Sequence, residues 1–169
     1  ELYMNDDEKI YDFLTVGINY YMDKFEVLVT NNFKTIEIRQ PRIGTIGVKI
    51  ENNLLNVNFS DVDFELAEIK EIMQNYKLKK KYHRLKNGAF ISLEDNADIK
   101  FIDDLFTGAD IDFKNINKNE IKMPIHRSLY LNKLLEGNKN KNIVKDANFK
   151  KVVGEITNLT DVENIDVPD

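Results

Sequence analysis

The sequence predicts an α+β fold, and three observations lead to that class. Apolar residues recur at three- and four-residue steps near both ends of the chain and in its middle, which is the helical period. Between them lie short β-rich runs, several of which alternate, separated by turn-forming residues. We therefore expect an antiparallel meander of about four strands plus a β-hairpin, packed with an N-terminal helix, two central helices and a helical C-terminal segment.

The first predicted element is a helix over residues 6–21. Asp6 and Asp7 suit an N-cap and first turn, because free backbone N–H groups and the positive end of the helix dipole face them. Gly17 is a weak point in this helix. An apolar stripe is expected to dock the helix on the rest of the fold and consists of Ile10, Phe13, Leu14, Ile18 and Tyr21.

The predicted meander follows in four short β-rich runs. The last two are joined through Asn52-Asn53 and form the clearest hairpin, because Asn tolerates the positive φ that such turns require. The runs cover residues 26–30, 35–39, 43–50 and 54–59.

Helical periodicity returns after Ser60, with Asp61 or Asp63 as the cap and an apolar stripe that continues to Tyr76. This helix is expected to end in the cluster 77–81, where cations suit the negative end of the dipole.

A second hairpin is predicted around Lys86-Asn87-Gly88, between strands at 81–85 and 89–93. A third helix is then expected to run to about Gly108, which is the predicted C-cap.

The sequence after Gly108 predicts several smaller elements. Ile111, Phe113 and Ile116 alternate as a possible edge strand, which residues 120–123 can extend. The elements expected after it are a helix opened by Pro124 and ending before Gly137, a hydrophilic loop over 138–145, a short helix that starts at Asp146 and passes through Ile156, and a linker over the last residues.

Composition limits the classes of function. The net charge of −5 gives no overall attraction to a polyanion, so a contact with nucleic acid must come from a local patch. Without cysteine there is no thiolate catalysis and no cysteine-based zinc site, and a reducing compartment is the natural expectation. No apolar run reaches the roughly 18–20 residues of a membrane span, so we expect a cytoplasmic protein with no membrane partner.

The candidate contact site is the basic stretch around 77–86. Its cations can contact phosphates, while Tyr76, Tyr82 and Phe90 are available to stack on bases. Two other interpretations stay open, namely a solvated edge whose charges block sheet pairing and a surface that docks on an acidic neighbouring domain. The cations concerned are Lys77, Lys79, Lys80, Lys81, Arg84 and Lys86.

The other polar clusters favour structural roles. Asp61, Asp63 and Glu65 alternate as in some metal loops, but they lack the glycine and closing glutamate of a calcium loop, so helix capping is the better interpretation. His83 and His126 are far apart in the chain and match no metal or general-base pattern. We predict no catalytic, cofactor or metal site, and a small-molecule ligand is not expected.

Four strings in order along the chain carry a resemblance to a known family. Phe33-Lys-x-Ile comes first and the 47–59 hairpin second. The third is Lys79-Lys-Lys-Tyr-His-Arg-Leu-Lys-Asn-Gly-x-Phe90, and the fourth is Ile125-His-Arg-Ser-Leu-Tyr-Leu-Asn-Lys-Leu-Leu135. Together they resemble the bacterial SNF2 helicase-associated region, which precedes the ATPase lobes of bacterial Swi2/Snf2-type translocases.

That resemblance implies an accessory domain over residues 1–157 and a linker over 158–169 toward an ATPase domain, with both ends being cuts through a longer polypeptide. Within the domain we expect an N-terminal helix and connection (1–25), an α+β core (26–108) and a helical extension (109–157).

The resemblance also implies how the work is divided within the longer protein. ATP and Mg²⁺ belong to the downstream motor, because this chain has no phosphate-binding loop. The partners implied are the chain's own motor in cis and DNA, which makes a nucleoid-associated location possible. Arg127 and Tyr130 are candidates for packing on the motor. The alternative is a free-standing module that binds nucleic acid or protein.

Overall fold

The structure is a computed structural model that describes residues 4–28, 33, 36–112, 116–117, 120–138 and 141–162. The chain divides into two compact units. One contains Glu1–Pro41 and Glu68–Asn96, and the other contains Arg42–Ala67 and Ala97–Asp169. We call them the first and the second unit. None of the described helices is long and apolar enough to span a membrane.

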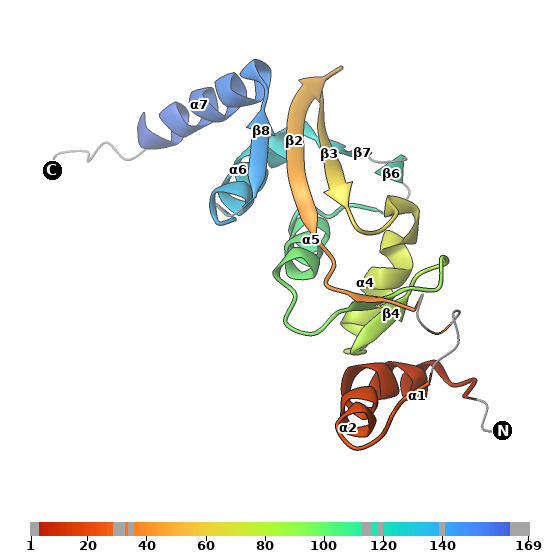
Figure 1. Cartoon of the computed structure of the whole chain (residues 1–169). Coiled ribbons are helices and arrows are strands. Elements are labelled where there is room, and N and C mark those ends of the chain that lie inside the picture. Colours follow the sequence, from red (N-terminus) through yellow and green to blue (C-terminus); the bar gives the residue numbers. More distant parts are fainter. Residues whose placement is uncertain are drawn as a thin grey trace, which may run out of the picture. The chain divides into compact units, whose positions relative to one another are not determined.

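The second unit is built on a five-stranded sheet in the order β6-β7-β3-β2-β8 (Figure 1). β2, β3, β7 and β6 are antiparallel neighbours, whereas β8 joins the sheet parallel to β2. The strands are β2 Ile43–Glu51, β3 Leu54–Val62, β6 Ile116–Asn117, β7 Glu120–Pro124 and β8 Asn142–Lys145.

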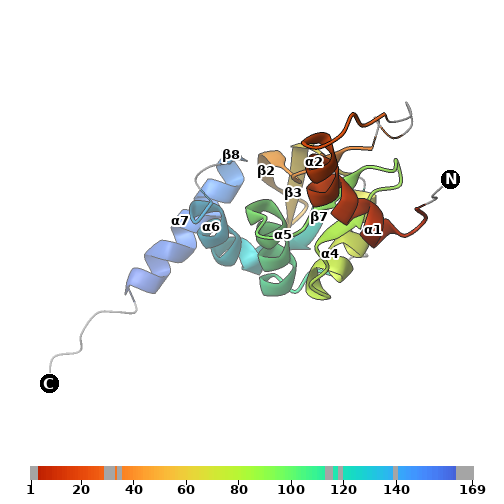
Figure 2. The same ribbon diagram turned by 60° about the horizontal axis from the view of Figure 1, so that its bottom comes forward.

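Helices cover this sheet and complete its core. β3 points Leu55, Val57 and Phe59 inward, and the Phe59 ring packs edge-on against Phe101 with 6.5 Å between ring centroids. Figures 1 and 2 show α5 and α6 side by side in this unit. The helical elements are α5 Ala97–Gly108, the 3-10 turn η4 Ile125–Arg127, α6 Ser128–Glu136 and α7 Ala147–Val162.

The first unit holds a three-stranded sheet in the order β1-β5-β4. β4 and β5 form an antiparallel hairpin, and β1 pairs parallel to β5. α4 buries Ile69, Ile72 and Met73. The elements are α1 Asp7–Asp12, a π-helical turn η1 Phe13–Gly17, α2 Ile18–Met22, β1 Ile38–Arg39, α4 Ile69–Lys77, β4 Tyr82–Arg84 and β5 Phe90–Ser92, with the 3-10 turn η2 Leu66–Glu68 leading into α4.

The predicted α+β class is confirmed, and so are both hairpins. Asn52 and Asn53 connect β2 to β3 with φ of 51° and 62°, as a tight turn with two left-handed residues requires. In the second hairpin Gly88 takes a φ of 89°, and its N–H donates to Leu85 O at 2.8 Å. Asp6 caps α1 as expected, because its Oδ1 accepts from Glu8 N at 2.9 Å.

The expected four-stranded meander is wrong in its first two strands. Residues 26–28 are not a strand, and 29–30 lie outside the described residues. Of the run 35–39, only Ile38–Arg39 forms a strand, and it pairs parallel to β5 in the other sheet. β7 and β8 take the places beside the β2–β3 hairpin.

The helix expected from Asp61 or Asp63 begins later. β3 continues to Val62, which pairs with Ile43, and Asp61 lies within that strand at a φ of 55°. α4 begins at Ile69 without a side-chain cap. The predicted capping role of Asp61 and Asp63 is therefore wrong.

The C-terminal half differs from the prediction at three places. The loop expected over 138–145 contains β8, which is held at the sheet edge by its pairing with β2. Asp146 starts α7 as expected: its Oδ1 accepts from Phe149 N at 2.7 Å, and its Oδ2 accepts from Ile50 N at 3.2 Å. α7 continues to Val162, so the first part of the expected linker is helical. In the expected edge strand, Ile116 lies in the edge strand β6 and residues 120–123 form β7 beside it, whereas Ile111 is not in a strand and Phe113 lies outside the described residues.

Gly108 has a packing role rather than the predicted capping role. The left-handed residue after α5 is Asp110, at a φ of 52°. The Tyr130 hydroxyl donates to Asp104 O at 2.5 Å, and a Cβ on Gly108 would overlap the Tyr130 phenol. Glycine is therefore required here because the phenol occupies the space of a side chain.

Gly108→Ala is expected to lower the free energy of unfolding by about 1–3 kcal/mol, because relief of the overlap with Tyr130 displaces a packed side chain. The matched control is Gly154→Ala in α7, where nothing lies within 4 Å of the added Cβ, and a gain of about 0.5–1 kcal/mol is expected from helix propensity. Urea unfolding of both variants checks the pair, and equal effects at the two positions would contradict this role of Gly108.

Candidate nucleic-acid contact site

The strongest candidate site is the turn at the C-terminal end of α4, residues Lys77–Lys81, which we call the basic turn. Its four lysines and Leu78 are exposed. Lys79 N donates to Tyr76 O at 2.9 Å and Lys80 N donates to Asn75 O at 3.0 Å, which is the bonding pattern of a Schellman C-cap. The helix therefore ends in a defined turn that presents cations.

Lys79 occupies the left-handed position of this cap, with a φ of 58°. Glycine is the usual residue there, because a Cβ in this conformation costs roughly 1–2 kcal/mol. Leu78, beside it, leaves 70% of its surface exposed. Leu78 and Lys79 thus contribute less to stability than a polar residue and a glycine would at these positions. Such departures from local preference are expected at functional surfaces.

Within the described part of the chain, the ammonium groups of Lys79, Lys80, Lys81 and Lys86 make no hydrogen bond or ion pair. Lys77 does take part in an interaction. Lys86 lies in the hairpin turn, where its backbone N–H donates to Glu68 Oε1 at 2.8 Å. β4 separates Lys81 from Lys86, which corresponds to roughly 15 Å of extended chain.

Tyr82 has a structural role instead of the stacking role that the sequence suggested. Its ring stacks on Tyr11 of α1 with 4.6 Å between centroids and meets Phe90 edge-on at 5.3 Å. Burial raises the pKa of the Tyr82 phenol, and the carboxylates of Asp7, Glu8, Asp6 and Asp12 raise it further. Phe90 is fully buried. The rings of Tyr82 and Phe90 therefore hold the N-terminal helix on the hairpin.

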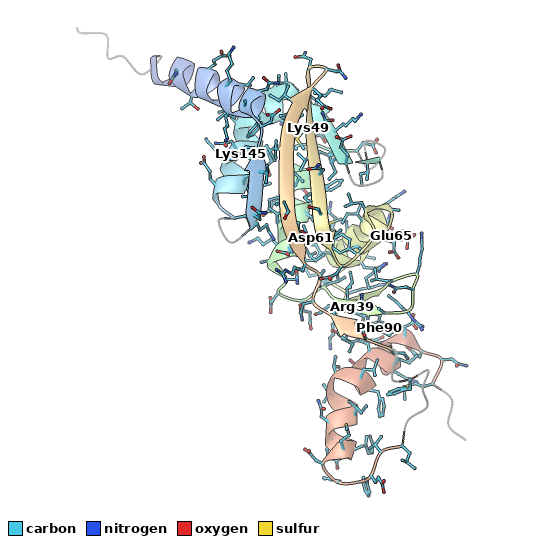
Figure 3. All side chains as sticks on the ribbon, turned by 45° about the horizontal axis from the view of Figure 1, so that its top comes forward. Arg39, Lys49, Asp61, Glu65, Phe90 and Lys145 are labelled. Carbon is cyan, nitrogen blue, oxygen red and sulfur yellow. The ribbon has the colours of Figure 1, made fainter. Side chains whose placement is uncertain are left out.

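Arg84 is also occupied. Its Nη1 lies 2.5 Å from Asp7 Oδ1, and its guanidinium lies over the Phe90 ring at 5.3 Å from the centroid. Figure 3 labels Phe90 within this unit. The pair is about 40% exposed, so we assign it at most about 1 kcal/mol. Arg84 thus serves the docking of α1, and it is not a free phosphate ligand.

Arg127 lies in the other unit, in the 3-10 turn before α6, and is half-buried. It is therefore not part of the basic turn. Tyr130, the second residue expected to pack on a motor, is committed to Asp104 and Gly108 within its own unit.

A buried histidine, to which the sequence assigned no metal or general-base role, lies on β4 beside the helix that ends in the basic turn. His83 on β4 is 5% exposed. Its Nδ1 lies 2.7 Å from Asn75 Nδ2, and its Nε2 has no hydrogen-bond partner among the residues that the structure describes. Burial lowers the pKa of His83, and Lys80 lowers it further, while Glu68 and Glu71 act in the opposite direction.

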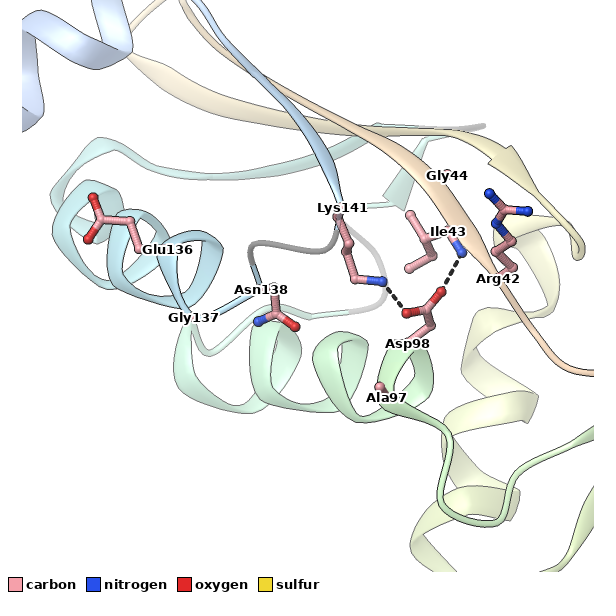
Figure 4. Close-up of a pocket in the computed structure, with 9 residues that line it drawn as sticks. All are labelled: Arg42, Ile43, Gly44, Ala97, Asp98, Glu136, Gly137, Asn138 and Lys141. Carbon is pink, nitrogen blue, oxygen red and sulfur yellow. Dashed lines mark hydrogen bonds and ion pairs between the residues drawn. The ribbon is translucent and has the colours of Figure 1, made fainter.

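The second unit has a hollow of about 490 Å³ between the start of β2, the start of α5 and the chain before β8 (Figure 4). The two charged side chains at its centre, Asp98 and Lys141, form an ion pair with each other. Asp98 accepts from Ile43 N at 2.6 Å through Oδ2 and pairs with Lys141 through Oδ1. The Lys141 side chain is only 8% exposed. Asp98 thus connects the start of α5 to β2 and to the chain before β8. The charges of Asp98 and Lys141 are used in this pair and are not available to a ligand.

The described residues contain no cluster of three or more His, Cys, Asp or Glu side chains that could hold a metal ion. In a comparison with protein families, the family described as bacterial SNF2 helicase associated matches residues 1–168. No curated protein and no solved structure matches the chain.

Lys79→Gly is expected to raise the free energy of unfolding by about 0.5–1 kcal/mol, because it removes the Cβ from a left-handed residue. Lys79→Gln is the matched control: it also removes the charge but keeps the Cβ, and its stability should stay within about 0.5 kcal/mol of wild type. Urea unfolding compares the two, and a gain shared by both variants would show that the charge, not the backbone, is responsible.

The lowered pKa of His83 predicts lower stability in mild acid. Below about pH 6.5 the unfolded chain binds a proton that the folded chain does not. The free energy of unfolding therefore decreases as the pH is lowered, by at most about 1.4 kcal/mol per pH unit, until His83 itself becomes protonated in the folded chain. Urea unfolding between pH 5.5 and 7.5 should show this slope in wild type and a smaller one in His83→Phe. His126, the other histidine, is exposed, so His126→Gln should retain the wild-type slope.

Proposed function

The chain belongs to the bacterial SNF2 helicase-associated family, and we propose that it is a non-catalytic accessory domain of an SNF2-type DNA-dependent ATPase that contributes a DNA contact through the basic turn. In this proposal the motor lies in cis and provides ATP binding, Mg²⁺ binding and hydrolysis. The protein would then act in the bacterial cytoplasm, on the nucleoid.

The observation that carries the proposal is the concentration of unpaired lysines at a turn that does not use them internally. Lys79, Lys80 and Lys81 are consecutive, exposed and without ion pairs among the described residues. A surface whose only role was solubility would not favour a lysine at a left-handed position. Contact with a polyanion explains both the unpaired charges and the presence of a lysine, rather than a glycine, at the left-handed position 79.

The chemistry of the turn favours phosphates over bases. Lysine ammonium groups act as point charges toward phosphate oxygens, and phosphate contacts position a protein without reading sequence. Tyr82 and Arg84, which could have stacked on bases or read their edges, are occupied by Tyr11 and Asp7. The contact is therefore independent of DNA sequence, as a motor that moves along DNA requires.

Reversal of Lys79, Lys80 and Lys81 to Glu should weaken binding of duplex DNA and reduce its salt dependence. If each lysine neutralises one phosphate, the slope of log affinity against log salt should become shallower by about 3. Fluorescence anisotropy with an unrelated duplex at several salt concentrations measures both quantities.

A matched control reverses three other exposed lysines, Lys70, Lys100 and Lys150, which gives the same net charge on three different helices. This variant should keep most of the wild-type affinity and slope. Equal losses in the two variants would point to overall charge and contradict a specific basic turn. No DNA binding by wild type at low salt would overturn the proposed contact.

A further inference from the structure

The N-terminal segment carries the second unexplained surface of the first unit, and its chemistry is opposite to that of the basic turn. Its most exposed apolar side chains are Val16 (72%), Tyr20 (56%), Met22 (62%), Phe25 (65%) and Leu28 (89%). We call these five residues the N-terminal apolar surface. Single exposed apolar residues need no explanation, but five within thirteen positions indicate an interaction site.

The local helix geometry explains why Met22 of this surface faces outward. Before the π-helical turn, Tyr11 is buried against Tyr82 and Phe90 and fixes α1 on the hairpin. The turn at Phe13–Gly17 contains a bond from Ile18 N to Phe13 O, one residue longer than an α-helical bond. Such an insertion rotates the helix after it by about 100°. Met22, eleven positions after Tyr11, thereby leaves the face that Tyr11 defines, and Phe25 and Leu28 follow the end of α2.

Two side chains support this insertion. The Thr15 hydroxyl donates to Tyr11 O at 2.9 Å. The Phe13 ring lies over Gly17, where a Cβ would approach its Cδ2 to 2.9 Å. The π-helical turn is thus built into the local sequence, and π-helical turns occur frequently at functional sites.

The charge around the surface identifies the class of partner. Residues 4–28 hold six carboxylates, at Asp6, Asp7, Glu8, Asp12, Asp23 and Glu26, against only Lys9 and Lys24. An acidic border repels DNA and anionic membranes alike. The surface therefore fits a protein partner with an apolar patch and a basic border.

We infer that the N-terminal apolar surface docks on the SNF2 motor itself. This rests on the proposed function, because the family match supplies the helicase as the partner. A protein that tracks along DNA carries basic surface for its phosphates, which complements the acidic border here. The first unit would then contact the motor through one surface and DNA through the other.

The test uses the chain of residues 1–169 and the SNF2 motor as a separate polypeptide, with affinity measured by titration calorimetry. Met22→Ser with Phe25→Ser should weaken binding to the motor at least about tenfold. Asp23→Lys with Glu26→Lys should also weaken it, and more so at low salt. Leu54→Ser with Val144→Ser, which removes two exposed apolar side chains from the second unit, should leave the affinity unchanged.

DNA anisotropy on the same variants separates this inference from the proposed function. If Met22→Ser with Phe25→Ser leaves motor affinity intact while the triple lysine reversal still weakens DNA binding, the docking surface is wrong and the DNA contact stands. If light scattering shows wild type to be a dimer that this apolar variant dissociates, with motor affinity unchanged, the partner is a second copy and the inference is overturned. Circular dichroism of each variant shows whether the fold is retained.

Discussion

The packing of Tyr11 on Tyr82 and Phe90 is the contact on which the first unit depends. It fixes α1 on the β4–β5 hairpin and places Asp7 at 2.5 Å from Arg84. Because the aromatic and guanidinium groups are used for this docking, Lys79, Lys80, Lys81 and Lys86 are the cations of the basic stretch that remain for an external partner among the described residues. The same contact anchors the start of the N-terminal helix, so the π-helical turn that follows decides what the rest of the helix presents.

Features that depend on neighbouring residues were predicted from the sequence. The Asn52-Asn53 turn, the Gly88 turn, the Asp6 cap and the helix that starts after Asp146 were all found. In each case the signal lies in a few adjacent residues whose backbone preferences suffice. The end of α4 within the lysine cluster was found for the same reason.

Features set by distant pairing were missed. The run 35–39 was expected in the meander, but its strand Ile38–Arg39 pairs parallel to β5 in the other sheet, a partner about fifty residues later in the chain. β8 is a run of Asn, Ile, Val and Lys that pairs with β2, nearly a hundred residues earlier in the chain. Asp61 resembles a helix cap in sequence, but the pairing of Val62 with Ile43 draws it into β3. In these places tertiary context overrides local preference.

The candidate site divides in the same way. The exposed lysines could be found from the sequence, because charge and a helix end are local signals, whereas the roles of Tyr82 and Arg84 could not, since Tyr11 and Asp7 are remote in the chain. The sequence also gave no sign that Lys79 takes the left-handed position or that Gly108 makes room for Tyr130. Both depend on geometry that only the folded chain defines.

The separation of charge within the first unit has a mechanical consequence. Arg84 and Asp7 form an ion pair that joins the N-terminal helix to the hairpin. Lys79, Lys80 and Lys81 form no ion pair with the acidic N-terminal segment among the described residues. Fields of exposed charges decay over about 8 Å at physiological salt, which lets each surface act on its own neighbour. In the proposed DNA contact, DNA would attract the basic turn and repel the acidic segment, so the unit would meet DNA in one orientation. In the proposed role, a domain oriented in this way would keep a fixed orientation on DNA while an attached motor moves, and this would require no catalytic group in the domain.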